Sequence, residues 1–288
     1  MGALFLIWSV WRNSRTISET EMLKRLPTTN AIVVSVNVGQ LRHSAIFDEL
    51  AGAKITEEPD YQAFVRDSGF DYKRDLDLVL ASFTPDSRYF VVRGRFDWIR
   101  LQAYAKHSGG ACYNDLCRLQ GSQPDRRISF IKLAHDVIGL AVTASDSAAS
   151  QLLQVSPQRS ISAPAEPVWI SMPGSTLARN ARILPGGGLL GSAISDVNEI
   201  MLTIGAQGNN FAARMEAQCR TSEDAQNLTG QLQALTSLLK GAMEREKKTP
   251  SAKDLTGVLT AGQFHHADRM VYGEWKLEKS FLDSLAGI

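Results

Sequence analysis

Apolar side chains recur along the chain with two periods, and segments of the two kinds alternate. Residues 31–38 gather β-branched side chains in one run, which predicts a strand. Residues 225–242 instead place alanine and leucine three and four positions apart, the spacing of one buried helix face. Thr221 is expected to open that helix, with Asp224 as its capping-box partner. The pattern therefore predicts both strands and a long amphipathic helix.

The other apolar segments extend this alternation. Turn residues between paired apolar runs predict hairpins at residues 76–96, 127–142, 199–219 and 263–277, and residues 168–171 predict one more strand. Helical spacing, with Asp97 and Ser145 as caps of two of the segments, predicts helices at residues 16–25, 39–52, 59–68, 98–107, 148–153, 175–184 and 278–285. Hairpins joined by helices favour an α+β fold of antiparallel sheets, each with helices on one face.

A proline- and serine-rich stretch divides the chain. Residues 156–167 hold three prolines and one large apolar side chain, Ile161, which is the composition of a linker. On either side the expected elements follow one order: strand, helix, hairpin, helix, hairpin, short helix. We therefore expect two similar units in tandem, at residues 27–155 and 168–288, preceded by an apolar segment and connector at residues 1–26.

The N-terminal run at residues 2–11 is apolar and uncharged, and Arg12 follows it directly. A helix that spans a bilayer needs about 20 apolar residues, so the run is too short as written. It also lacks the basic start and the cleavage site of a secretory signal. Three interpretations stay open: the end of a membrane anchor that begins upstream of Met1, an interfacial anchor using Trp8 and Trp11, or a helix packed on the protein itself.

Charge is nearly balanced, with 31 Lys and Arg against 30 Asp and Glu and a formal net charge of +1. Proteins that bind DNA or RNA through phosphates need a concentrated positive surface. The basic clusters at residues 126–127 and 245–248 are short, and we expect them to be solvated surface. Nucleic acid is therefore not an expected partner.

The cysteines bear on the cellular compartment. Cys112 and Cys117 enclose four residues, and a turn of that length can bring two Cα atoms within disulfide range. Because a disulfide persists only in an oxidising compartment, a bridge and a pair of free thiols both stay open. A zinc site needs four ligands, and no second Cys or His pair stands at a suitable spacing. Cys219 has no obvious partner and is expected to be a small core residue.

Several short segments match catalytic or cofactor-binding motifs, but they lack the secondary structure or the partner motifs that the chemistry requires. Residues 186–191 have the spacing of a dinucleotide fingerprint, but a helical stretch precedes them and no acid follows about 20 residues on. Ser129 and Lys132 match S-x-x-K inside a predicted strand, where positions three apart face opposite ways. The same string at residues 237–240 lacks its partner motifs. We therefore predict no cofactor and assign no catalytic residue.

Metal ligands are not expected either. His265 and His266 are neighbours on a predicted strand and point to opposite faces, so they cannot easily share a metal. Asp71, Asp75 and Asp77 lack the alternating spacing of a calcium loop and are expected to be solvated helix ends. Core packing is the expected role of three tryptophans: Trp98, Trp169 and Trp275.

Four segments resemble an uncharacterised bacterial family: residues 112–117, Gly121-Ser122, Arg127-Ile128-Ser129-Phe130 and residues 254–262. The similarity covers most of the chain from about Leu26 onward. The resemblance implies an N-terminal membrane anchor and an exported domain, and therefore a location in the cell envelope. It implies no reaction. The short apolar N-terminus departs from the family pattern.

These observations favour a non-enzymatic, envelope-associated protein that is tethered by its N-terminus, membrane-anchored or periplasmic, and binds a partner or ligand between its two units. The alternative is an enzyme whose site is assembled at the interface between the units. A cytoplasmic protein with reduced thiols is a third interpretation. A pocket that gathers His or acidic side chains with shifted pKa values would favour the enzyme, and an exposed apolar patch would favour a binding protein.

Overall fold

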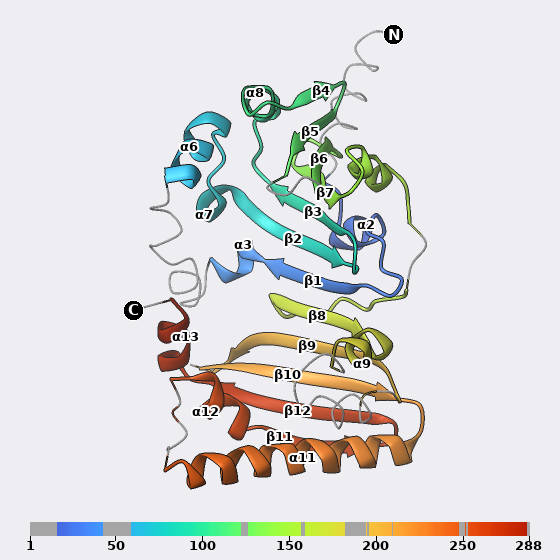
Figure 1. The fold of residues 1–288 in the computed structure, drawn as a ribbon, viewed down its shortest axis with the longest axis vertical. Helices are drawn as coiled ribbons and strands as arrows, with labels where there is room; N and C mark the ends of the chain where they lie inside the picture. The colour runs from blue at the N-terminus through green and yellow to red at the C-terminus, as the bar shows by residue number, and fades with distance from the viewer. Residues whose placement is uncertain are drawn as a thin grey trace. The chain divides into compact units, whose positions relative to one another are not determined.

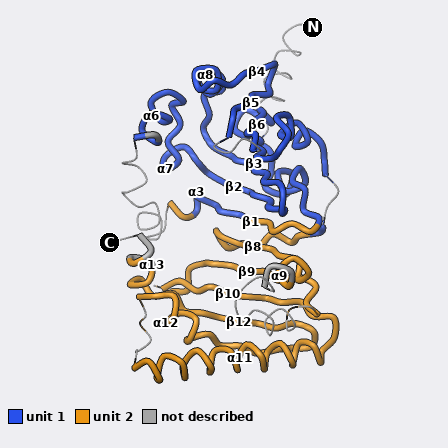
Figure 2. The backbone as a smooth tube through the Cα atoms, viewed as in Figure 1, with its two compact units in different colours: residues 1–29, 35–40, 53–160 blue, residues 30–34, 41–52, 161–288 orange. Residues whose placement is uncertain are grey.

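A computed structural model of the chain describes residues 16–42, 59–121, 126–156, 159–181, 194, 196–208, 210–247, 251 and 253–286. It divides into two compact units (Figure 2). The first comprises residues 1–29, 35–40 and 53–160, and the second comprises residues 30–34, 41–52 and 161–288. The division after residue 160 falls inside the stretch expected to be a linker, whose residues 159–167 form neither helix nor strand. Residues 30–34 belong to the second unit, although the sequence places them in the first.

The first unit is an antiparallel sheet with helices (Figure 1). Its strands lie in the order β1-β2-β3-β7-β6-β5-β4, and of β1 only residues 35–37 belong to this unit. The strands are β1 (Ile32–Asn37), β2 (Leu76–Phe83), β3 (Arg88–Gly94), β4 (Ala111–Tyr113), β5 (Leu116–Gln120), β6 (Arg127–Lys132) and β7 (Val137–Thr143). The helices are α2 (Glu19–Leu23), α3 (Val38–Leu41), α6 (Pro59–Ser68), α7 (Tyr72–Asp75), α8 (Trp98–His107) and the 3-10 helix η1 (Ala148–Leu153).

The second unit is also an antiparallel sheet with helices. Its strands lie in the order β11-β12-β10-β9-β8. They are β8 (Val168–Pro173), β9 (Val197–Gln207), β10 (Asn210–Cys219), β11 (Gln263–Ala267) and β12 (Met270–Leu277). The helices are α9 (Gly174–Ala181), α11 (Ser222–Arg245), α12 (Leu255–Thr260) and α13 (Lys279–Ala286).

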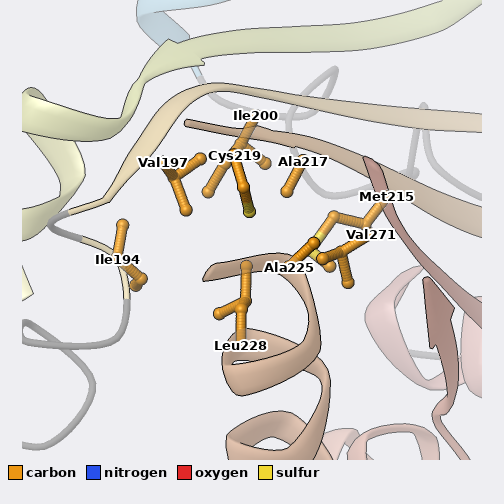
Figure 3. Close-up of a cluster of buried hydrophobic side chains, with 9 residues drawn as sticks. All are labelled: Ile194, Val197, Ile200, Met215, Ala217, Cys219, Ala225, Leu228 and Val271. Carbon is orange, nitrogen blue, oxygen red and sulfur yellow. The ribbon is translucent and has the colours of Figure 1, made fainter. Parts of the chain in front are cut away.

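The long helix α11 forms as its sequence predicts. The Thr221 hydroxyl accepts a hydrogen bond from Asp224 N at 3.1 Å, and the Asp224 carboxylate accepts one from Thr221 N at 2.9 Å. Two backbone donors of the first turn are thereby satisfied, and the capping box is confirmed. Figure 3 shows how Ala225 and Leu228 then point from α11 into a cluster on the sheet that contains the buried Cys219. The remaining members of this core cluster are Ile194, Val197, Ile200, Met215, Ala217 and Val271.

Several local expectations need correction. Residues 148–153 form a 3-10 helix, and its N-cap is Ser147 rather than Ser145. The helix is held by Ser129, whose buried hydroxyl accepts a hydrogen bond from Ala149 N at 3.0 Å. The hairpin β4–β5 and the helices α7 and α12 have no counterpart in the expected elements. Most of the helix expected at residues 39–52 lies outside the described residues.

Candidate functional site

An apolar pocket of about 290 Å³ lies within the second unit. Sheet strands provide one wall, and α12 and α13, which lie beside the sheet in Figure 1, provide the other. Its lining residues are Val168, Ile170, Leu202, Thr203, Ile204, Ala213, Leu255, Val258, Leu259, Trp275, Leu277 and Phe281.

Strand register explains why a hollow forms there. Val168 pairs with Ile204, Ile204 with Ala213 and Ala213 with Trp275, so these four side chains form one row across four strands. Directly paired residues of neighbouring strands share a sheet face. Ala213 is the smallest member of the row, and its larger neighbours therefore flank a depression. Thr203 precedes Ile204 on β9, so its side chain points to the opposite face and only its backbone reaches the pocket.

The outer wall depends on the short helix α12. Asp254 caps it, because its carboxylate accepts hydrogen bonds from Thr256 Oγ1 at 2.5 Å and from Gly257 N at 2.9 Å, and these two bonds lower the pKa of Asp254. The Ser284 hydroxyl of α13 donates to the Lys253 carbonyl at 2.6 Å and joins the two helices.

α12 also presents leucine to solvent at the edge of the pocket. Val258 faces inward and is 8% exposed, whereas Leu255 is 60% and Leu259 42% exposed. Burying such side chains is favourable, at about 25 cal/mol per Å² of apolar surface removed from water. Since the lining carries no charged side chain, the pocket suits an apolar group and would penalise a buried charge.

A second, polar cleft of about 820 Å³ lies in the first unit beside the start of α8. The carboxylate of Asp75 is one of its lining groups, with a side chain only 7% exposed. Arg74 donates to it through Nε and Nη2 at 3.1 and 3.0 Å, and Arg95 forms an ion pair with it, with Nη2 at 3.1 Å from the carboxylate. The cleft is lined by Gly69, Arg74, Asp75, Gly94, Arg95, Phe96, Asp97, Trp98, Ile99, Arg100, Lys132, His135 and Asp136.

The environment of Asp75 corrects the expectation that this aspartate is solvated. Burial by itself raises the pKa of Asp75, but hydrogen bonds from Arg74 and from the Asp71 backbone, together with the charges of Arg74 and Arg95, outweigh burial. The pKa therefore lies below the ordinary value of 3.8, and Asp75 is a carboxylate at neutral pH.

The structure places the expected cysteine pair across a hairpin. Cys112 and Cys117 are directly paired on β4 and β5, with Cα atoms 4.0 Å apart, and are joined by a disulfide. Cys219 is a buried free thiol in the second unit. Its pKa is raised, first by burial and then by the charges of Asp224 and Asp196.

The weaker motifs do not come together. His265 stacks on Tyr272, and among the residues that the structure describes no group of three or more His, Cys, Asp or Glu side chains could hold a metal ion. The Ser237 hydroxyl donates to the Gln233 carbonyl of its own helix. The fingerprint at residues 186–191 lies outside the described residues.

Two tryptophans expected in the core also line cavities. Trp169 is buried as expected, but Trp275 lines the apolar pocket and Trp98 lines the polar cleft. Their neighbours come from distant segments, so the pattern of the sequence around each tryptophan could not reveal these positions.

Known proteins show a likeness of fold. The structure called "Structure of crystal form I of TP0453" matches with a TM-score of 0.54 and 9% sequence identity, over 95% of this chain and 98% of that chain. The one called "Structure of crystal form III of TP0453" matches with a TM-score of 0.53 and 9% identity, over 92% and 98%. No protein-family model and no curated protein matches the chain. At this identity the likeness shows the fold alone, and the α+β class expected from the sequence is confirmed.

Proposed function

We propose that the protein is a non-enzymatic binding protein whose second unit takes the apolar part of a ligand into the pocket beneath α12. The observation that carries this proposal is the apolar lining of that pocket together with the exposed leucines of α12 at its edge. Its volume of about 290 Å³ corresponds to the lower end of small-molecule sites, about 300–1,000 Å³. The ligand is therefore one with a single chain or a small ring system, whose charged or polar end stays outside the pocket.

We also propose that the two units are related repeats. The order β1-β2-β3-β7-β6 in the first unit corresponds to β8-β9-β10-β12-β11 in the second. A helix lies between the central partners in both cases, α8 between β3 and β7 and α11 between β10 and β12 along the chain. The hairpin β4–β5 and helices α6 and α7 would then be additions to the first unit.

We propose that the protein is located in the cell envelope and is attached to the membrane through its N-terminus. The support is the apolar run at residues 2–11, which lies outside the described residues, and the pairing of Cys112 with Cys117. No helix in the described part of the chain is long and apolar enough to cross a membrane. The alternative of an enzyme assembled between the units, and the absence of a nucleic-acid partner, stay predictions.

Binding of an uncharged fluorescent probe, N-phenylnaphthylamine, tests the pocket. We expect saturable binding accompanied by a change in the fluorescence of Trp275, because this side chain lines the pocket. Ala213→Phe fills the depression and should abolish binding. Leu255→Ser removes an exposed apolar wall and should weaken binding about fivefold, equivalent to about 1 kcal/mol of lost apolar contact.

Leu238→Ser is the matched control. Leu238 lies on α11, is 62% exposed against 60% for Leu255, and does not line the pocket, so its loss should leave binding unchanged. The proposal fails if the probe does not bind, or if folded Ala213→Phe protein binds it as tightly as the unmodified chain.

A further inference from the structure

The polar cleft of the first unit contains two arginines that one carboxylate holds side by side. Asp75 accepts hydrogen bonds from Arg74 and forms an ion pair with Arg95, and Arg95 donates to the Arg74 carbonyl. The arginine side chains themselves remain 66% and 67% exposed. A guanidinium has five N–H donors, so donors remain on each arginine for a third group. Asp75 already orders these two long side chains, so a ligand that binds them causes a smaller loss of side-chain conformational entropy.

The cation of Arg100 is fixed at the same cleft by helix α6. Arg100 donates to the carbonyl of Asp67 at 3.3 Å and to the carbonyl of Arg66, which lie in the last turn of α6. Gly69, with φ of 72°, ends that helix, and a Cβ at this position would stand 2.5 Å from Arg100 Nη1. A glycine is therefore required for the guanidinium to reach these carbonyls.

Two further donors at the cleft have no acceptor among the residues that the structure describes. The ammonium of Lys132 forms no ion pair with these residues, and the buried Nε1 of Trp98 has no hydrogen-bond partner among them. Leaving a buried donor unpaired costs free energy, so such an atom points to a missing acceptor. The lining carries one more cation than anion, since Asp75, Asp97 and Asp136 face Arg74, Arg95, Arg100 and Lys132.

We propose that this cleft binds the oxyanion group, a carboxylate or a phosphate, of a small organic molecule. Arg74, Arg95 and Lys132 hold the anion, and the apolar remainder of the molecule lies against Phe96 and Ile99, the latter 78% exposed. Arginine and lysine form charge-assisted hydrogen bonds with oxyanions, and paired guanidinium donors suit two oxygens of one group. The volume, about 820 Å³, is that of a small-molecule site. This site is separate from the apolar pocket, and neither proposal depends on the other.

Calorimetric titration of the full chain at constant ionic strength tests the proposal with three probes: phenyl phosphate, benzoate and inorganic phosphate. We expect saturable binding of phenyl phosphate or benzoate, and which of the two binds more tightly identifies the anion. Inorganic phosphate should bind more weakly because it lacks the ring. Lys132→Gln and Arg74→Gln should each weaken binding about tenfold, the effect of losing one charge-assisted hydrogen bond.

Arg118→Gln is the control, because Arg118 is a 52% exposed cation, paired with Asp146, that does not line the cleft. It should leave the affinity within about twofold, as expected for a surface ion pair. Lys132→Gln breaks no ion pair among the described residues, so it decides the question if Arg74→Gln fails to fold. The proposal is overturned if no probe binds at millimolar concentration, if binding is unchanged in Lys132→Gln, or if inorganic phosphate binds as tightly as the tighter of the two aromatic probes.

Discussion

At the scale of single residues, Asp75 links two segments of the first unit. Its carboxylate receives the backbone N–H of Asp71 at 3.0 Å and the guanidinium groups of Arg74 and Arg95. Its own carbonyl accepts from Arg95 N at 2.8 Å. Asp75 therefore ties α7 to the end of β3, and its charge matters for stability as well as for the cleft.

Asp75→Asn should destabilise the protein by about 2 kcal/mol, because it removes a buried charge that accepts hydrogen bonds from Asp71 and Arg74 and pairs with Arg95. The figure is below that for a fully buried ion pair, since both arginines can regain water. The folded pKa of Asp75 is lower than the ordinary 3.8, so the folded state binds this proton less readily than the unfolded state. The stabilisation is thus complete above the unfolded pKa and is lost as the pH falls through the folded pKa. Urea unfolding at a series of pH values measures both effects.

Asp86→Asn is the control for this prediction, because Asp86 is exposed in the turn between β2 and β3. The variant at position 75 should show a flatter decline of stability in acid than the control. An unchanged urea midpoint at neutral pH would mean that the two ion pairs contribute nothing net.

The sequence indicates residues that act locally and misses those that act at a distance. Asp97 was predicted as the cap of α8, and its carboxylate accepts from Arg100 N at 3.1 Å, three residues away. Asp75 was expected to be solvated because its partner Arg95 is twenty positions along the chain and reaches it only through the pairing of β2 with β3. Lys132 of β6 and Trp98 of α8 also line the cleft from segments far apart along the chain.

At the scale of elements, the capping box of α11 has a measurable effect. Thr221→Ala removes the acceptor for Asp224 N, and we expect a loss of about 1 kcal/mol in the free energy of unfolding. Ser237→Ala on the same helix is the control, because its hydroxyl only donates to the Gln233 carbonyl and alanine favours helix. Equal urea midpoints for the two variants would contradict a role for the box.

Elements with a strong period or a clear turn were predictable, and the missed ones share a physical cause. α6 and α8 match their expected bounds because apolar spacing and helix end signals coincide there. β4 and α12 are too short for a period to show, and α12 becomes helical with Asp254 as cap and Val258 packed on Leu277 and Phe281. Since α12 forms the pocket's outer wall, the candidate site could not be derived from the pattern.

At the scale of the whole molecule, the proposed envelope address predicts the state of the native protein. In its source cells it should fractionate with the membrane or with the periplasm, and its intact, non-reduced mass should be two hydrogen atoms below that of the reduced chain, because Cys112 and Cys117 are joined. The mass after reduction is the control. A cytosolic species that starts at Met1 with three free thiols would refute this address.

The strand order also determines when the sheet of each unit can be completed during synthesis. In the first unit β7 lies between β3 and β6, although it is the last of these strands along the chain. Until Thr143 has left the ribosome, β3 keeps an open edge and β6 lacks its neighbour β7, so a shorter nascent chain exposes strand edges that invite wrong pairing. In the second unit β12 has the same position between β10 and β11, so β10 is paired only with β9 and keeps one open edge until Leu277 has emerged. Each unit therefore exposes open strand edges until its own closing strand, β7 or β12, has been made.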